Sequence, residues 1–72
     1  MRNYKLEEFV PAKWEDVNVG DIVFCKLNGN FYTDLVKAKD QQRGVQIGNN
    51  RGSINGWTKQ VYGKVVEIIK SA

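Results

Sequence analysis

One dipeptide, Asn28-Gly29, constrains the fold of this chain more than any other feature of the sequence. It separates residues 22–27 from residues 30–37, two runs rich in the β-branched and aromatic side chains that favour strands. Asn-Gly is the pair best suited to a type I′ turn, because both residues tolerate a positive φ. The sequence therefore predicts an antiparallel hairpin that is closed by a two-residue turn.

The rest of the chain repeats this pattern of short apolar runs between turn residues. A polar loop at residues 39–44 leads into a short third strand at residues 45–47. Residues 60–70 are predicted to form a long closing strand, in which Gly63 marks a bulge or a bend. Together these elements predict an all-β fold, a small antiparallel, SH3-like barrel of about five strands.

A chain of 72 residues forms a single small domain. The barrel is expected over residues 20–70, after an N-terminal arm at residues 1–19. Pro11 forbids one continuous helix in that arm, so we expect a short helix at residues 5–10 and a turn at residues 12–16. Three apolar residues of the arm are expected to cover an open end of the barrel: Phe9, Trp14 and Val17.

The sequence offers few residues for catalysis. It has one cysteine, Cys25, and no histidine, so a disulfide within the chain, most zinc sites and the usual serine triad are excluded. Cys25 lies in an apolar run and is predicted to be buried. A pair of Ser53 with Lys37 or Lys59 is not expected, because a lysine base must be desolvated and these lysines have polar neighbours. We therefore expect no enzyme activity, no cofactor and no metal.

The N-terminal sequence predicts a cytoplasmic location. No apolar run approaches the roughly 20 residues that a membrane-spanning helix needs. The first residues lead into acidic side chains instead of the apolar stretch of a signal peptide. The expected protein is soluble and has no membrane contact.

Basic residues concentrate in the C-terminal part of the chain. The formal charge is +3 overall, but residues 1–21 contain three basic and five acidic side chains. Trp57 and Tyr62 lie among the later basic residues, a combination compatible with phosphate contacts and base stacking. Nucleic-acid binding is therefore one alternative function, with four candidate residues: Arg43, Arg51, Lys59 and Lys64.

Residues 46–57 contain three glycines and three asparagines, the residues that tolerate compact turns, and Asn55-Gly56 suggests a second tight turn. Trp, Tyr and Arg dominate the energetics of protein interfaces. The leading hypothesis is a binding module that contacts a protein partner through residues 46–62. An exposed edge strand would make the protein a monomer or a weak homodimer. The candidate contact residues are Asn49, Asn50, Arg51, Asn55, Trp57 and Tyr62.

Four short motifs also follow one another in a familiar order. They are Val-Gly-Asp-Ile-Val-Phe at 19–24, Asp-Leu-Val at 34–36, Ile-Gly-Asn-Asn at 47–50 and Val-Tyr-Gly-Lys-Val-Val at 61–66. This order resembles the catalytic β-domain of type I signal peptidases and of the LexA-related self-cleaving repressors. In that family a Gly-Asp pair opens a strand, a later strand carries the general base, and a Gly-Asp-Asn box precedes an Ile-Gly-Lys-Val strand. The resemblance implies a peptidase-β-domain-like barrel.

The same resemblance implies that the catalytic positions are lost. The position of the nucleophilic serine is held by Ala12, and the position of the lysine base falls near Asp34. Alanine cannot attack a peptide bond. Asn49 replaces the aspartate of the box. The resemblance therefore adds a further alternative, a degenerate peptidase-like domain with a purely structural role.

Overall fold

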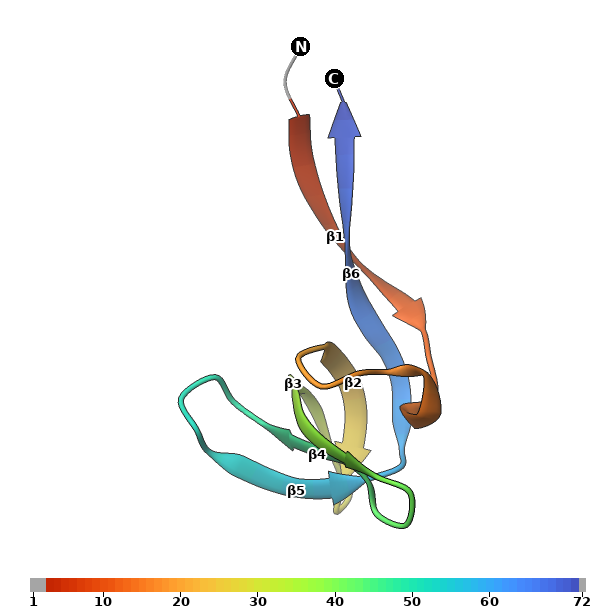
Figure 1. Ribbon diagram of the computed structural model, residues 1–72, viewed down its shortest axis with the longest axis vertical. Helices are drawn as coiled ribbons and strands as arrows, with labels where there is room; N and C mark the ends of the chain where they lie inside the picture. The colour runs from red at the N-terminus through yellow and green to blue at the C-terminus, as the bar shows by residue number, and fades with distance from the viewer. Residues whose placement is uncertain (1–2, 72) are drawn as a thin grey trace.

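A computed structural model describes residues 3–71 of the protein, with side chains described for residues 6–67 (Figure 1). The all-β fold class is confirmed, since the described residues form strands and one short 3-10 helix. No helix among them is long and apolar enough to cross a membrane. The elements are β1 (Asn3–Pro11), η1 (Trp14–Asp16), β2 (Ile22–Leu27), β3 (Asn30–Asp40), β4 (Gly44–Gly48), β5 (Ile54–Thr58) and β6 (Val61–Ser71).

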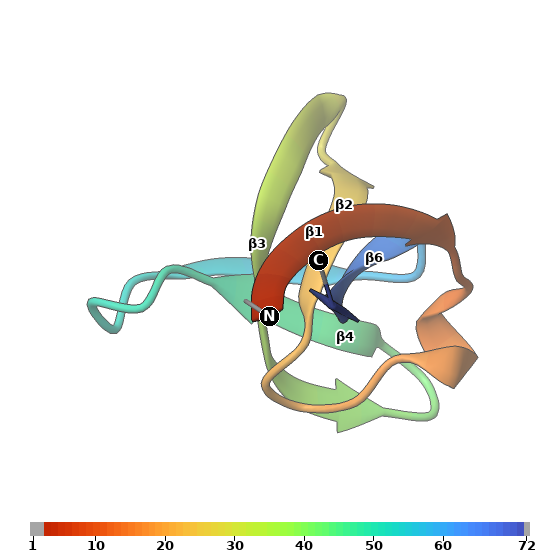
Figure 2. The ribbon, with the colours of Figure 1, turned by 90° about the horizontal axis from the view of Figure 1, so that it is seen from above.

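The strands form one six-stranded antiparallel sheet in the order β1-β6-β2-β3-β4-β5. The sheet curls strongly, but it remains open, with β1 and β5 as its edges (Figure 2). The predicted antiparallel β-sheet is confirmed, but it has six strands instead of about five and does not close into a barrel. Closure fails because β5 runs into β6 without pairing with it, while β1 takes the outer side of β6.

The predicted hairpin is confirmed. Asn28 and Gly29 have φ values of 50° and 82°, both positive as a type I′ turn requires. The turn fixes the register of β2 against β3, with Leu27 opposite Asn30. Since side chains alternate along a strand, this register decides which residues of both strands share a face.

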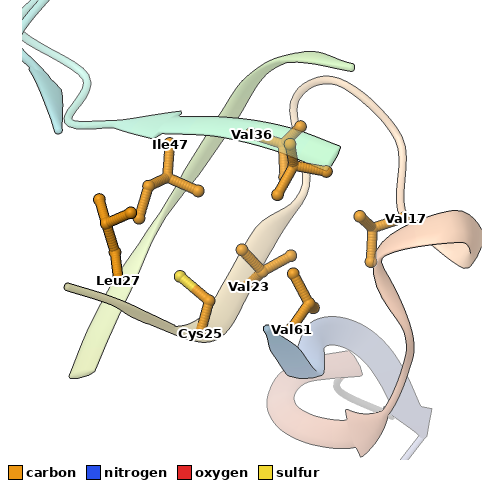
Figure 3. Packing of buried hydrophobic residues seen from close by; sticks show 8 residues of the cluster. Val17, Val23, Cys25, Leu27, Val36, Ile47 and Val61 are labelled. Carbon is orange, nitrogen blue, oxygen red and sulfur yellow. The ribbon is translucent and has the colours of Figure 1, made fainter. Parts of the chain in front are cut away.

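The core is small and aliphatic (Figure 3). In β2 the buried residues alternate with partly exposed ones, and β3, β4 and β6 add their inward side chains to the same cluster. Cys25 is fully buried among them, as predicted. The cluster consists of Val17, Val23, Cys25, Leu27, Val36, Val45, Ile47 and Val61, with Ala12, Trp14 and Tyr32 packed against it.

The N-terminal arm differs most from the expectation. Residues 5–10 lie in strand β1, so the expected helix is wrong. Leu6, Phe9 and Val10 have a helical spacing, but hydrogen bonding to β6 overrides that local preference. The turn expected at residues 12–16 contains η1, and the Val17 that follows is fully buried in the core. The side chain of Phe9 is 56% exposed, so it covers no end of a barrel.

Two glycine predictions have different outcomes. Asn55-Gly56 lies inside β5 and forms no tight turn, because the chain reverses earlier, at residues 50–53. The bulge expected near Gly63 is confirmed: the pairing of β6 with β2 shifts between Phe24 and Cys25. A Cβ on Gly63 would lie 2.8 Å from the carbonyl oxygen of Val10, so this glycine lets β1 approach β6 closely.

Beyond the body, β1 and β6 continue together as a two-stranded ribbon that projects away from the other strands (Figure 1). It gives the protein an elongated shape of 46 × 25 × 20 Å. The body thus carries the core, and the ribbon extends from it.

Candidate functional site

The outer face of the sheet carries a group of aromatic side chains. In β2, Val23, Cys25 and Leu27 point into the core, so Phe24 and Lys26 point outward. Phe31 is paired with Lys26 and therefore shares its face. Rings from β1 and β6 join the phenylalanines of the hairpin. We name this group the aromatic face; it consists of Phe9, Phe24, Phe31 and Tyr62.

Phe24 is at the centre of the aromatic face. Its ring is stacked on Phe31, with centroids 5.5 Å apart and planes 4° apart. Tyr62 lies 6.0 Å from Phe24 at a tilt of 48°, and Phe9 meets Phe24 edge to face at 6.2 Å. These separations are those of favourable ring pairs. The four rings therefore form one continuous surface, although they come from four strands.

Most of this surface is open to solvent. Phe9, Phe31 and Tyr62 are 56%, 60% and 47% exposed, while Phe24 is half-buried between them. A groove of about 440 Å³ runs beside the rings, and its lining is almost entirely apolar. Its lining residues are Phe9, Val10, Pro11, Phe24, Tyr62 and Gly63.

The Lys26 ammonium borders the aromatic face in the hairpin. The Lys26 Nζ lies 5.3 Å from the centre of the Phe31 ring, a distance at which the ammonium is attracted to the ring face. The aromatic face is thus apolar at its centre and has a positive group at the β2–β3 side.

A second surface group combines basic side chains with the two tryptophans. The Arg43 guanidinium lies 4.1 Å from the Trp57 ring, and the Lys59 ammonium lies 5.4 Å from the Trp14 ring. Lys39 lies 6.0 Å from Trp14 and donates a hydrogen bond to the backbone oxygen of Glu15. We name this group the tryptophan patch; it consists of Trp14, Lys39, Arg43, Trp57 and Lys59.

Asp40 lies within the tryptophan patch and partly offsets its charge. Its carboxylate accepts a hydrogen bond from the Gln42 backbone N–H at 3.0 Å and from the Arg43 Nε at 2.6 Å. These bonds, the backbone one above all, lower the pKa of the Asp40 carboxyl below its ordinary value. Arg43 is therefore held both by a carboxylate and by a ring.

The asparagine-rich loop is organised by one side chain. The Oδ1 atom of Asn49 accepts hydrogen bonds from the backbone N–H groups of Arg51 at 2.9 Å and Ser53 at 3.1 Å. Gly48 is required beside it, because a Cβ there would collide with the Ser53 carbonyl oxygen. The Asn49 amide thus stabilises the loop itself, as local asparagine bonds commonly do.

The structure separates the residues that the sequence grouped as a contact surface. Asn49 and Asn50 border a groove of about 350 Å³ with Asp34, which accepts a hydrogen bond of 2.5 Å from the Asn55 Nδ2. Arg51 is exposed in the loop, and half-buried Trp57 lies against Arg43. Tyr62 belongs to the aromatic face.

The predicted nucleic-acid contacts are separated in the same way. Arg43 lies over the Trp57 ring and Lys59 over the Trp14 ring, and both charges act on Asp40. Arg51 is on the loop, and Lys64 is half-buried in β6, between Val10 and Val23 of the neighbouring strands.

The residues that sequence reasoning missed are Phe9, Phe24 and Phe31. The shared face of Phe24 and Phe31, the two residues from the hairpin, could have been predicted from the sequence. An Asn28-Gly29 turn fixes the register, and alternation then places Phe24, Lys26 and Phe31 together on the face opposite Val23 and Cys25. Phe9 had no such signal, since its place depends on the pairing of β1 with β6.

Buried Cys25 offers no reactive group. Burial, assisted by the negative charge of Asp34, raises the pKa of its thiol from 9.0 to about 11, so it is protonated at neutral pH. Within the described part of the chain, no three His, Cys, Asp or Glu side chains come close enough together to hold a metal ion.

Comparison of the chain with protein families, with curated proteins and with solved structures found no match. The arrangement of its own residues is therefore the basis for the function proposed below.

Proposed function

We propose that this protein is a non-enzymatic cytoplasmic binding module and that a protein partner binds its aromatic face. The observation that carries the proposal is the exposure of Phe9, Phe31 and Tyr62, each about half or more, in one continuous ring cluster around Phe24. Monomeric proteins rarely expose a contiguous apolar surface without a use for it. Aromatic residues are enriched at the centres of protein interfaces.

The geometry of the aromatic face favours a partner with apolar side chains. The rings are already fixed against one another, so little conformational entropy is lost when they are covered. The adjoining groove beside Pro11 and Gly63 is apolar and can accept a protruding side chain. Lys26 at the border would pair with an acidic residue at the rim of the interface.

Nucleic-acid binding is a second candidate, and the tryptophan patch is the observation that favours it. Arg43, Lys59 and Lys39 supply positive charge next to two rings. However, the cations already occupy ring faces that bases would stack on, and Asp40 lies among them. We therefore rank this candidate below the protein partner.

The resemblance to signal peptidases supports the non-enzymatic part of the proposal. Ala12 holds the position of that family's serine and packs against the core, where it offers no nucleophile. A purely structural role remains the alternative if the aromatic face binds nothing.

A display selection with matched variants tests the proposal. Protein fragments are selected against the full chain, and binders are measured by titration with Phe31→Ser and Tyr62→Ser. We expect each substitution to weaken binding about 30-fold, which corresponds to about 2 kcal/mol. Ile54→Ser is the control, because Ile54 is 49% exposed on β5 and lies outside the aromatic face.

Two results would reject the protein-partner proposal. One is a set of binders that tolerate Phe31→Ser and Tyr62→Ser but lose affinity with Ile54→Ser. The other is the absence of any fragment binder together with oligonucleotide binding that Arg43→Ala and Lys59→Ala abolish. Such oligonucleotide binding should also weaken steeply with salt.

A further inference from the structure

Strand β1 presents an unpaired edge. It is the first strand of the sheet order, it spans Asn3–Pro11, and among residues 3–71 it pairs with β6 alone. An edge strand carries a row of backbone N–H and C=O groups that can pair with a further strand. The outer side of β1 is therefore a template for β-pairing.

Proteins usually protect such edges, and the two edges of this sheet differ in this respect. β5 is short, Ile54–Thr58, and its pairing with β4 is broken by a register shift next to Gly48. The pairing of β1 with β6 runs without a shift from Asn3 to Pro11. The proline is at the end of β1 and leaves the rest of the edge open.

The ribbon also needs further contacts for its stability. An isolated two-stranded ribbon is marginally stable in water, and a third strand or a packed face is needed. Here β1 and β6 project away from the body (Figure 1), and Leu6 is 38% exposed. A strand added to the β1 edge would supply the missing neighbour.

We propose that the added strand is β1 of a second copy, which pairs antiparallel about a two-fold axis to form a β6-β1-β1-β6 sheet. An antiparallel edge is complementary to itself, so one copy satisfies the other without a different partner. Because the ribbon projects from the body, the two bodies lie at opposite ends of the shared sheet and do not collide.

Charge selects the register of this pairing. A two-fold axis at Glu7 or Glu8 would place glutamate opposite glutamate, which destabilises a strand pair. An axis at Phe9 would bring the bodies together and would include Pro11, which has no N–H. An axis at Leu6 avoids both problems and pairs residues 3–9 of each copy. Leu6 then faces Leu6 of the second copy.

This dimer uses the backbone edge of β1, whereas the proposed partner site uses the rings of the aromatic face; Phe9 is the residue common to both. Sedimentation equilibrium of the full chain, from about 1 µM to about 1 mM, tests it directly, since small interfaces bind weakly. We expect a reversible monomer–dimer equilibrium within this range. A protein that stays monomeric throughout would overturn the proposal, whatever the outcome of the fragment selection.

Matched variants test whether the two-fold axis of the dimer passes through Leu6. Leu6→Glu or Leu6→Lys alone should weaken self-association at least about tenfold, because like charges then face each other. An equimolar mixture of the two variants should restore the dimer as a heterodimer, which a merely unfolded variant could not do. Ile54→Glu, on the β5 edge, should leave the dimer unchanged. A dimer that survives Leu6→Glu but is lost with Ile54→Glu would place the interface at β5 instead.

Discussion

The two faces of the sheet differ in composition and exposure. The inner face is filled by valine, isoleucine, leucine and one cysteine, all nearly inaccessible to solvent. The outer face carries three phenylalanines and a tyrosine, most of them half exposed. Both faces are apolar: the partly buried rings of Trp14 and Tyr32 pack against the inner core, whereas the four rings of the aromatic face lie outside. A protein that needed its rings only for stability would bury them, because a small domain gains most from large buried side chains.

If the proposed function holds, stability depends on the inner face and recognition on the outer face, only one strand thickness apart. Val23 and Cys25 point to the core, while Phe24 between them is the centre of the aromatic face. Substitutions on the inner face should therefore unfold the protein, and substitutions on the outer face should alter binding. Four measurements follow in order of decreasing expected effect; the first compares the two faces directly, and the other three test single hydrogen-bonding side chains of the body.

The largest effect is expected for Ile47→Ala on the inner face. Ile47 is fully buried in β4, so removing its side chain leaves a cavity and should cost about 2–5 kcal/mol of unfolding free energy. Phe31→Ala on the outer face is the matched control and should cost about 1 kcal/mol, mainly through lost ring contacts. Urea unfolding of both variants measures the difference. Equal losses would show that the rings of the outer face are structural.

A smaller loss is expected for Thr58→Val. The Thr58 hydroxyl donates a 2.6 Å hydrogen bond to the Lys26 carbonyl and accepts one of 3.0 Å from the Gln60 N–H. This residue ties β5 to β2 where the sheet fails to close, and valine would leave both backbone groups without these bonds. The expected cost is about 1–3 kcal/mol. Thr58→Ser keeps the hydroxyl and should retain most of the stability in the same unfolding experiment.

Asn49→Ala, in the loop between β4 and β5, should lower the free energy of unfolding by about 1 kcal/mol. It removes the oxygen that accepts hydrogen bonds from the N–H groups of Arg51 and Ser53. Asn49→Asp keeps an acceptor oxygen and should be tolerated better. Thermal unfolding reports stability, and amide exchange at Ser53 reports the loop itself. Faster exchange with Asp than with Ala would contradict the assigned role.

The smallest effect concerns Asp40 in the tryptophan patch. Its pKa is lowered in the folded state by the Gln42 N–H and by Arg43. The stabilisation that ionised Asp40 provides is therefore fully present above the pKa of this carboxyl in the unfolded chain. It is lost as the pH falls through the lower pKa of the carboxyl in the folded protein. Unfolding midpoints should decline slightly more from pH 5 to about pH 3 in the unsubstituted protein than in Asp40→Asn. If the unfolding midpoints of both proteins decline in parallel, the hydrogen bonds to Asp40 contribute nothing to stability.

Features of the fold and of the candidate site were predictable from the sequence where they depend on interactions between residues close together in the chain. The hairpin is local, and Asn28-Gly29 predicted both its turn and its register. The burial of Cys25 also followed from the apolar run that contains it. Only part of the aromatic face could be predicted from the sequence. Strand alternation places Phe24 and Phe31 on one face, but it does not predict the position of Tyr62, which lies at a bulge of β6.

The structure divides the predicted contact surface of residues 46–62 among separate places for a similar reason. Sequence proximity suggested that Trp57 and Tyr62 act together, but a corner lies between β5 and β6. Trp57 is paired with Gln46 and stacks with Arg43, whereas Tyr62 joins Phe24 and Phe31. Trp57 and Tyr62 are close in sequence, but they have different neighbours because the chain turns between β5 and β6.

The all-β class, the central hairpin and a small core follow from the sequence alone, because chain length limits the core and because turn chemistry and strand alternation act over a few residues. Three features follow from the tertiary structure instead: residues 3–11 form a strand, the sheet stays open, and four rings meet outside it. They depend on the pairing of β6 with β1 and with β2, strands that are far apart in the sequence. No local preference encodes such a pairing, since its free energy comes from contacts that exist only once the sheet has formed.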